Sequence, residues 1–128
     1  MKLHRGLTLA LLLPVLAGCT PALEANLAFV DGPPILTFST KGLFPRRLDS
    51  ICLWSAEIID DVSGKVALKL LASDFERSCA SVGQVSFNKP ERGLMKVGQT
   101  GGIVRGRTYH AEVIADEGMG KSQSWLQQ

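Results

Sequence analysis

The chain has 128 residues, which is enough for one domain of ordinary size and too few for two. Hydrophobic residues make up 45% of it and charged residues 20%, with 13 glycines and 6 prolines, which excludes disordered and collagen-like chains. The formal net charge is +2, and Lys and Arg are scattered along the chain, so the basic patch that nucleic-acid binding requires is missing. We therefore expect one globular domain and no nucleic-acid partner.

The first 18 residues have the features of an export signal. Lys2, His4 and Arg5 form a positive segment, and the apolar run 7–16 follows it. A membrane-spanning helix needs about 20 apolar residues, and this run ends after roughly a dozen. Removing the signal also removes Lys2 and Arg5, so 12 basic residues face 12 acidic ones in the rest of the chain.

Leu16, Ala17, Gly18 and Cys19 end this segment and resemble the lipobox of bacterial lipoproteins. The resemblance implies that residues 1–18 are removed, that the Cys19 thiol receives a diacylglycerol, and that the new amine is acylated. Small residues before the cysteine let a peptidase approach the backbone, and a thiolate can attack a lipid donor. One acyl chain binds membranes only marginally and each buried CH₂ adds roughly 0.8 kcal/mol, so several chains would anchor the protein permanently.

Thr20 follows the cysteine where Asp could stand. In lipoproteins this pattern resembles delivery to the outer membrane, on the side that faces the periplasm. The alternative is an ordinary secretory signal in which Cys19 occurs by chance. Apart from the covalent diacylglycerol and N-acyl chain on Cys19, we expect no cofactor.

The segment between the signal and the folded domain is predicted to be a tether. Residues 19–34 are assigned to the lipidated N-terminus and tether, and 35–128 to the domain. Within the tether, 27–30 is a candidate edge strand that ends before Pro33 and Pro34, which cannot donate to a ladder.

Alternating patterns then predict the first strands of the domain. Residues 35–42 predict a strand ending at Gly42, and 44–47 a polar turn or loop. Residues 48–59 have apolar side chains on both alternating faces, which is typical of a central strand, and Trp54 on it is expected to be structural. The turn 60–64, in which Asp can bond its own backbone and Gly64 can take positive φ, leads into 65–72, so this pair is predicted to be a hairpin. The expected face of 48–59 that carries Trp54 also contains Leu48, Ser50, Cys52, Ala56 and Ile58.

The second half of the chain is also predicted to consist of short strands and turns. Residues 73–81 fit a helical turn or a loop equally well, and short strands are expected at 82–87 and near 93–99. The clearest alternation is 108–115. A turn at 116–120 is expected to precede a closing strand at 121–128, with Trp125 facing inward.

Six to eight short strands with frequent turns predict an all-β, antiparallel sandwich or barrel. Within it, 103–113 resembles the approach to strand F in fibronectin type III domains, through Ile103, Gly106, Tyr109, Ala111 and Val113. The resemblance implies an immunoglobulin-like or fibronectin-like sandwich in which Tyr109 is structural and its hydroxyl bonds back to the preceding corner. The outline also resembles small envelope lipoproteins of proteobacteria, which implies a fold and no activity.

Cys52 and Cys79 are the cysteines that remain after Cys19. An exported protein meets an oxidising compartment, and two cysteines allow one pairing. A structural disulfide is the favoured interpretation, and it would contribute about 2–4 kcal/mol. Metal binding would require more ligands in close spacing, and His110 is the one histidine after the signal, so we expect no metal site.

Residues 101–108 have the glycine spacing of a phosphate-binding loop, with Arg107 in place of its lysine. Such a loop lies between a strand and a helix N-terminus. Because a strand is predicted next, we expect turns at these glycines and no nucleotide.

His110 is the one candidate general base of its type, and it shares a strand face with Thr108 and Glu112. A serine nucleophile would need His110, a carboxylate and an oxyanion hole to converge, and no GxSxG motif is present. We favour a solvated outer surface for this face.

Charged pairs occur at four further places. The acidic pairs 60–61 and 116–117 lack the spacing of an EF-hand and are expected to be turns. The cationic spots 46–47, Arg105 and Arg107 could contact anionic lipid or an acidic partner, although solvated charge is the usual explanation.

These features together predict a lipid-anchored periplasmic sandwich that works by binding, as a non-catalytic accessory or structural lipoprotein of the cell envelope. Edge strands or loops would contact an envelope protein that the sequence does not identify. One alternative is an inhibitor or immunity-type lipoprotein that blocks a periplasmic enzyme. A less favoured one is a cell-envelope hydrolase that uses His110.

Overall fold

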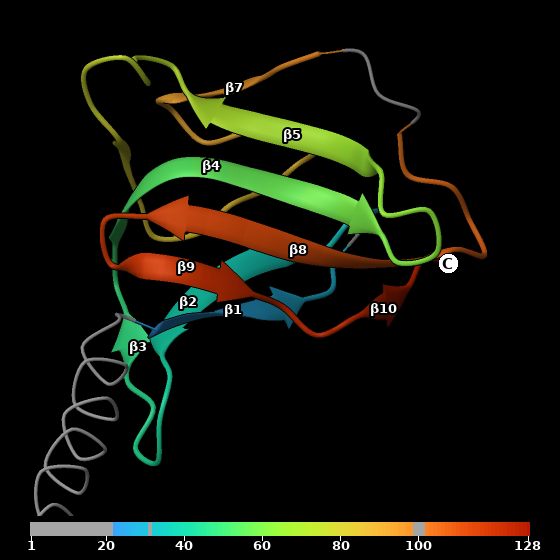
Figure 1. Ribbon diagram of the computed structural model, residues 1–128, viewed down its shortest axis with the longest axis horizontal. Coiled ribbons are helices and arrows are strands. Elements are labelled where there is room, and N and C mark those ends of the chain that lie inside the picture. Colours follow the sequence, from blue (N-terminus) through green and yellow to red (C-terminus); the bar gives the residue numbers. More distant parts are fainter. Residues whose placement is uncertain (1–21, 31, 99–101) are drawn as a thin grey trace, which may run out of the picture.

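The computed structural model describes residues 22–30, 32–98 and 102–128, and this part of the chain is all-β, as predicted (Figure 1). The strands are β1 (Ala22–Ala28), β2 (Ile35–Thr40), β3 (Arg47–Leu48), β4 (Ile51–Asp60), β5 (Val66–Ala72), β6 (Ala80–Val82), β7 (Leu94–Lys96), β8 (Thr108–Ala115), β9 (Gly118–Lys121) and β10 (Trp125–Leu126). Within the described ranges, no helix could span a membrane. The predicted signal 1–18 and Cys19 lie outside the described residues.

The strands form one strongly curled sheet in the order β3-β2-β1-β9-β8-β4-β5-β7, with β10 beside β8 and β6 beside β4. Figure 1 shows β5, β4, β8 and β9 in front, with β1 and β2 behind them, so the curled sheet makes the two layers of a sandwich. The described residues form ten strands where six to eight were expected, because several pairing segments are only two or three residues long.

One pairing departs from the antiparallel prediction. β1 runs parallel to β9, with Leu23 opposite Gly120. A side chain at position 120 would place its Cβ 2.7 Å from the carbonyl oxygen of Leu23, so glycine permits this close approach. The parallel pair connects the two layers along one edge.

The core lies between the layers and is filled from both. β1 and β2 contribute one set of buried apolar side chains, and β4, β5 and β8 contribute the facing set. Its largest fully buried members are Tyr109, Phe38, Phe87, Leu36, Ile51, Leu53, Ile58, Leu70, Val85 and Val113. Burial of this continuous apolar surface is the main stabilising contribution to the fold.

The folded part begins earlier than the sequence indicated. Strand β1 lies inside the segment 19–34 that was assigned to the tether, and Leu23 and Ala25 on it are buried in the core. The alternation of this strand is hard to recognise because one of its inward positions is only an alanine. Only the first two residues of the candidate strand 27–30 belong to β1, and Phe29 and Val30 lie beyond its end and are exposed.

The face assignment of the central strand is also corrected. A register shift between Leu53 and Ser55 marks a β-bulge in β4 against β8. It puts Ile51 and Leu53 on the same inner side as Ala56 and Ile58, and it leaves Trp54 half-buried outside the core. A period-two pattern cannot represent the extra residue that a bulge inserts.

Two turn predictions changed in detail. Residues 73–77 form hydrogen-bonded turns, in which the Arg77 and Ser78 N–H groups donate to the Asp74 carbonyl, and no α-helix forms before β6. The turn predicted at 116–120 is limited to the first residues of that segment, and β9 begins at Gly118. The predicted closing strand is divided between the end of β9 and β10, with Trp125 buried as expected.

Candidate functional site

Tyr109 and Trp125 are aromatic neighbours in the core. The Tyr109 hydroxyl accepts a hydrogen bond from the Val104 N–H at 2.8 Å, five residues back along the chain. Its ring centroid lies 6.0 Å from that of Trp125, which is also buried. This back-bonded tyrosine is the contact that the fibronectin resemblance implies, and both residues serve the fold.

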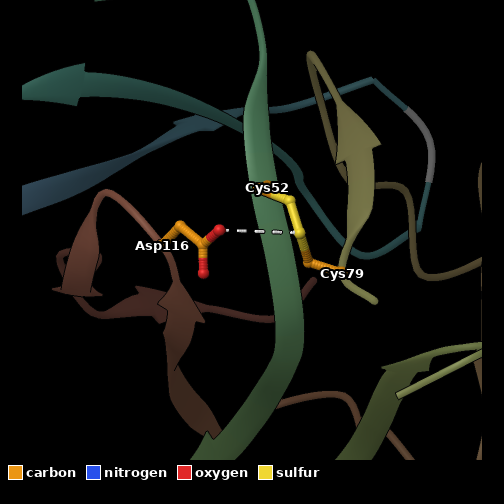
Figure 2. A group of neighbouring side chains, drawn as sticks. All are labelled: Cys52, Cys79 and Asp116. Carbon is orange, nitrogen blue, oxygen red and sulfur yellow. Dashed lines mark hydrogen bonds between the residues drawn. A yellow bond between two sulfur atoms is a disulfide. The ribbon is translucent and has the colours of Figure 1, made fainter. Parts of the chain in front are cut away.

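Cys52 on β4 and Cys79 before β6 are joined in a disulfide, as predicted (Figure 2). The bridge closes a sequence separation of 27 residues and attaches the loop after β5 to the central strand. Figure 2 shows Asp116 pointing toward the Cys79 sulfur, 3.8 Å away. Since a disulfide sulfur carries no proton and neither thiolate is free, this group offers no metal site in the oxidised protein.

Asp116 and Glu117, the acidic pair beside the disulfide, accept hydrogen bonds from β4. Asp116 Oδ1 accepts a hydrogen bond from the Trp54 indole N–H at 2.7 Å, and Glu117 Oε1 accepts one from the Cys52 N–H at 2.9 Å. The turn between β8 and β9 is thereby fastened to β4. Trp54 makes this contact through its ring nitrogen, outside the core.

His110 lies on the outer side of β8 between two carboxylates. Its Nδ1 is 2.5 Å from Asp61 Oδ1, and its Nε2 is 3.5 Å from Glu112 Oε2. Glu112 is also 3.5 Å from the ammonium group of Lys121. A nucleophile–base pair would need one ring nitrogen directed at a hydroxyl, whereas both face carboxylate oxygens here. The contacts form a network of polar side chains that connects the β4–β5 turn, β8 and β9.

Asp60 and Asp61 are held by hydrogen bonds that favour their charged forms. The backbone N–H groups of Ser63 and Val62 lower the pKa of Asp60, burial opposes this, and Arg107, 3.0 Å away, lowers it further. The hydrogen bond from His110 lowers the pKa of Asp61, burial again opposes, and a hydrogen bond from Ser124 adds to the lowering. The predicted Asp turn is confirmed, with Gly64 at φ 72°.

The lowered pKa values predict a loss of stability in acid. Both carboxyls have folded-state pKa values below the ordinary 3.8, so their contribution is complete above about pH 4 and is lost as the pH falls through the folded values. Thermal melts from neutral pH to about pH 2 should show Tm falling below pH 4. In Asp60→Asn, Tm should be lower at neutral pH and should fall less in acid. Parallel Tm curves for the two proteins would contradict this account.

The outer face of the front layer carries a row of apolar side chains. Across five strands, Met119 is opposite Ile114, Ile114 opposite Ser55, Ser55 opposite Leu71, and Leu71 opposite Met95. Met119 is 71% exposed, Ile114 45% and Met95 38%, and the small Ser55 lies covered at the centre. We call Met119, Ile114, Leu71 and Met95 the apolar row.

A row of charged side chains lies beside the apolar row, two residues away from it on each strand. Lys121, Glu112, Glu57 and Lys69 are opposite one another in that order. Each glutamate is balanced by the lysine on its other side, at 3.5 Å for Glu112 and 3.4 Å for Glu57. We call these four residues the charged row.

A hollow of about 230 Å³ lies between the two rows. Its lining comes from β4, β8 and β9 and includes Ser55, Glu57, Glu112, Ile114, Met119 and Lys121. The sequence did not identify this face as a site. The available indication was the apolar Ile114, which follows Thr108, His110 and Glu112 on the outward side of the most clearly predicted strand.

The glycine-rich segment before β8 is irregular in its described part, with a turn at residues 105–106. Gly102 and Gly106 have positive φ, and the strand β8 follows where a phosphate-binding loop would require a helix. Arg107 is paired with Asp60, and Arg105 is exposed. Gly101 lies outside the described residues.

A second hollow, of about 470 Å³, lies between the end of β1 and β10. Phe29, Val30, Trp125 and Leu126 line it together with polar residues of the chain end. The lining residues that the structure describes are apolar or uncharged.

Comparisons of the chain with protein-family models, with curated proteins and with solved structures gave no match. The functional interpretation therefore depends on the residues described above.

Proposed function

We propose that the chain is a bacterial lipoprotein that is anchored through Cys19 on the periplasmic side of the outer membrane and binds another envelope protein without catalysis. The observation that carries the proposal is the sequence Leu16–Cys19, which ends a short apolar segment with the residues of a lipobox. Lipid on Cys19 would fix the domain at the membrane surface. The acidic pairs and His110 are engaged in turns and ion pairs, which fits a domain whose surface is used for contact.

The exposed sheet face supports a binding role. Met119 and Ile114 form one apolar pair of the row, Leu71 and Met95 form the other, and the polar Ser55 lies between the two pairs. The charged row borders the apolar row on one side. Exposed apolar side chains beside a polar rim are a feature of protein interfaces. We assign the partner contact to this face.

Crosslinking followed by purification from membranes tests the binding role. The chain carries a tag after Gln128, and three forms are compared: the parent, Met119→Arg in the apolar row, and the control Val62→Arg. Val62 is an apolar residue with 89% exposure on the β4–β5 turn, outside the apolar row. A guanidinium buried at a protein contact should lower partner recovery about tenfold, as for interface hot spots.

The proposal expects envelope proteins that copurify with the parent and with Val62→Arg and are lost with Met119→Arg. Equal recovery with all three forms would remove the sheet face as the contact. A single soluble enzyme, bound one to one and inhibited, would instead favour the inhibitor function. Recovery of nothing above background from crosslinked cells would contradict a binding role.

A further inference from the structure

The hairpin between β2 and β3 exposes an apolar pair at its tip. Leu43 is 94% exposed and Phe44 is 89% exposed, more than the residues of the apolar row. They belong to the seven residues 41–47, which contain Lys41, Arg46 and Arg47 and no acidic residue. We call residues 41–47 the hairpin tip.

Two hydrogen bonds between Thr40 and Arg46 close the base of the hairpin tip. The Thr40 N–H donates to the Arg46 carbonyl at 2.9 Å, and the Arg46 N–H donates to Thr40 Oγ1 at 2.9 Å. At the base of the tip, Ser39 is opposite Arg47, and Phe38, which is buried in the core, is opposite Leu48. Leu43 and Phe44 are therefore presented by a closed turn and are not available to the core.

The three basic side chains of the hairpin tip, Lys41, Arg46 and Arg47, make no ion pair within the described part of the chain. Two exposed apolar side chains with three free cations around them have the composition of segments that enter the boundary between lipid headgroups and acyl chains. Anionic headgroups complement these charges.

The hairpin tip lies at the same end of the sheet as the start of β1. This shared position indicates which surface the tip contacts. Leu23 is opposite Thr40 in the β1–β2 pair, so β1 begins at the end of the sheet from which the tip projects. Figure 1 shows the β2–β3 hairpin and the start of β1 at one end, and the β4–β5 turn at the opposite end. Two residues lie between Cys19 and Ala22. The three Cα–Cα steps that join Cys19 to Ala22 span at most about 11 Å.

We infer that the hairpin tip inserts Leu43 and Phe44 into the membrane that holds the Cys19 lipid, with Lys41, Arg46 and Arg47 on anionic headgroups. The inference rests on the proposed function, because it takes Cys19 to be lipidated. An anchor and an inserted tip at one end hold the domain in a fixed orientation on the bilayer. The apolar row is then presented to partners at a constant height.

The test uses the full lipidated protein, extracted from membranes and reconstituted in vesicles of phosphatidylcholine and phosphatidylglycerol with or without brominated acyl chains. Phe44→Trp places an indole at the tip, and the matched control Val62→Trp places one on the opposite end at the same 89% exposure. Trp54 and Trp125 are present in both variants and contribute the same background fluorescence. Bromine quenches an indole only when the indole reaches the acyl region.

The inference expects both variants to float with the vesicles and the indole at position 44 to be quenched at least about twofold more than the indole at position 62, because side chains inserted at the interface reach the acyl boundary. Quenching should weaken in vesicles of phosphatidylcholine alone, and equal quenching there would overturn the role of the cations. Flotation without quenching at position 44 would overturn the inserted tip and leave the lipid anchor intact. A purified chain that carries no lipid and does not float would overturn the anchor and, with it, the inference.

Discussion

Replacing Cys19 with serine is expected to stop lipid attachment and to change the processing of the chain. A serine hydroxyl is a far weaker nucleophile than a thiolate, so no diacylglycerol is transferred, and a peptidase that acts on lipidated precursors leaves residues 1–18 in place. In cells fed with labelled fatty acid, the parent should incorporate label, and Cys19→Ser should incorporate none and migrate as the larger precursor. Cys19→Ser that is cut to the same size as the parent would identify an ordinary secretory signal.

A second form separates the lipid from the apolar run as the source of membrane attachment, because an uncleaved signal can itself hold Cys19→Ser on the membrane. Residues 1–19 are replaced by a cleavable secretory signal, so that the mature chain begins at Thr20 without lipid. Several acyl chains give nearly complete membrane attachment, whereas a bare domain has no comparable apolar anchor. The parent should therefore sediment with membranes, and most of the exchanged form should be soluble. Equal sedimentation of the two forms would contradict a lipid anchor as the main attachment.

Removing the disulfide is expected to have the largest effect on stability. The double variant Cys52→Ser, Cys79→Ser frees the loop after β5 from the central strand, and loss of a bridge of this length costs about 2–4 kcal/mol. For a domain of this size the loss corresponds to a Tm lower by about 10 °C or more. Thermal melts of the two proteins under oxidising conditions measure it, and reductant should lower the Tm of the parent toward that of the variant.

The matched control removes a neighbour of the bridge and keeps the bridge itself. Asp116→Asn retains an acceptor for the Trp54 indole N–H, so its Tm should stay much closer to that of the parent. Alkylation should label Cys52 and Cys79 only after reduction. A double variant with the Tm of the parent, or two thiols that react without reductant, would contradict a stabilising disulfide.

The fold class was predictable because alternation in single segments identifies strands directly. Tyr109, Ala111, Val113 and Ala115 alternate without interruption, and β8 has those residues buried. The β4–β5 hairpin was also correct, because its turn chemistry depends on local residues such as Asp60 and Gly64. Such features depend on a few neighbouring residues and need no knowledge of the pairing between distant strands.

The predictions that were wrong concern features that depend on pairing between strands distant in the sequence. The bulge at Trp54 exists only against β8, so the pattern of β4 alone placed Trp54 on the same face as Ala56 and Ile58. The parallel pair of β1 and β9 depends on the close approach of Gly120 to Leu23, which are nearly a hundred residues apart in sequence. Without that pair, residues 22–28 resemble a tether.

The candidate site was predictable only in part, for the same reason. The cysteine pair was identified because two cysteines allow one pairing, and it is present as a disulfide. The surroundings of His110 required the position of Asp61, which comes from another strand's turn. The apolar row required the register of five strands, since its members come from four separate segments of the sequence.

The lipid on Cys19 is the claim on which the proposed location, orientation and binding role depend. The most direct measurement is the mass of the protein extracted from membranes, together with that of its first peptide. The account predicts a chain that begins at Cys19, lacks residues 1–18 and carries a diacylglycerol and an amide-linked acyl chain on that residue. An intact N-terminus, or a chain that begins elsewhere with an unmodified Cys19, would contradict it.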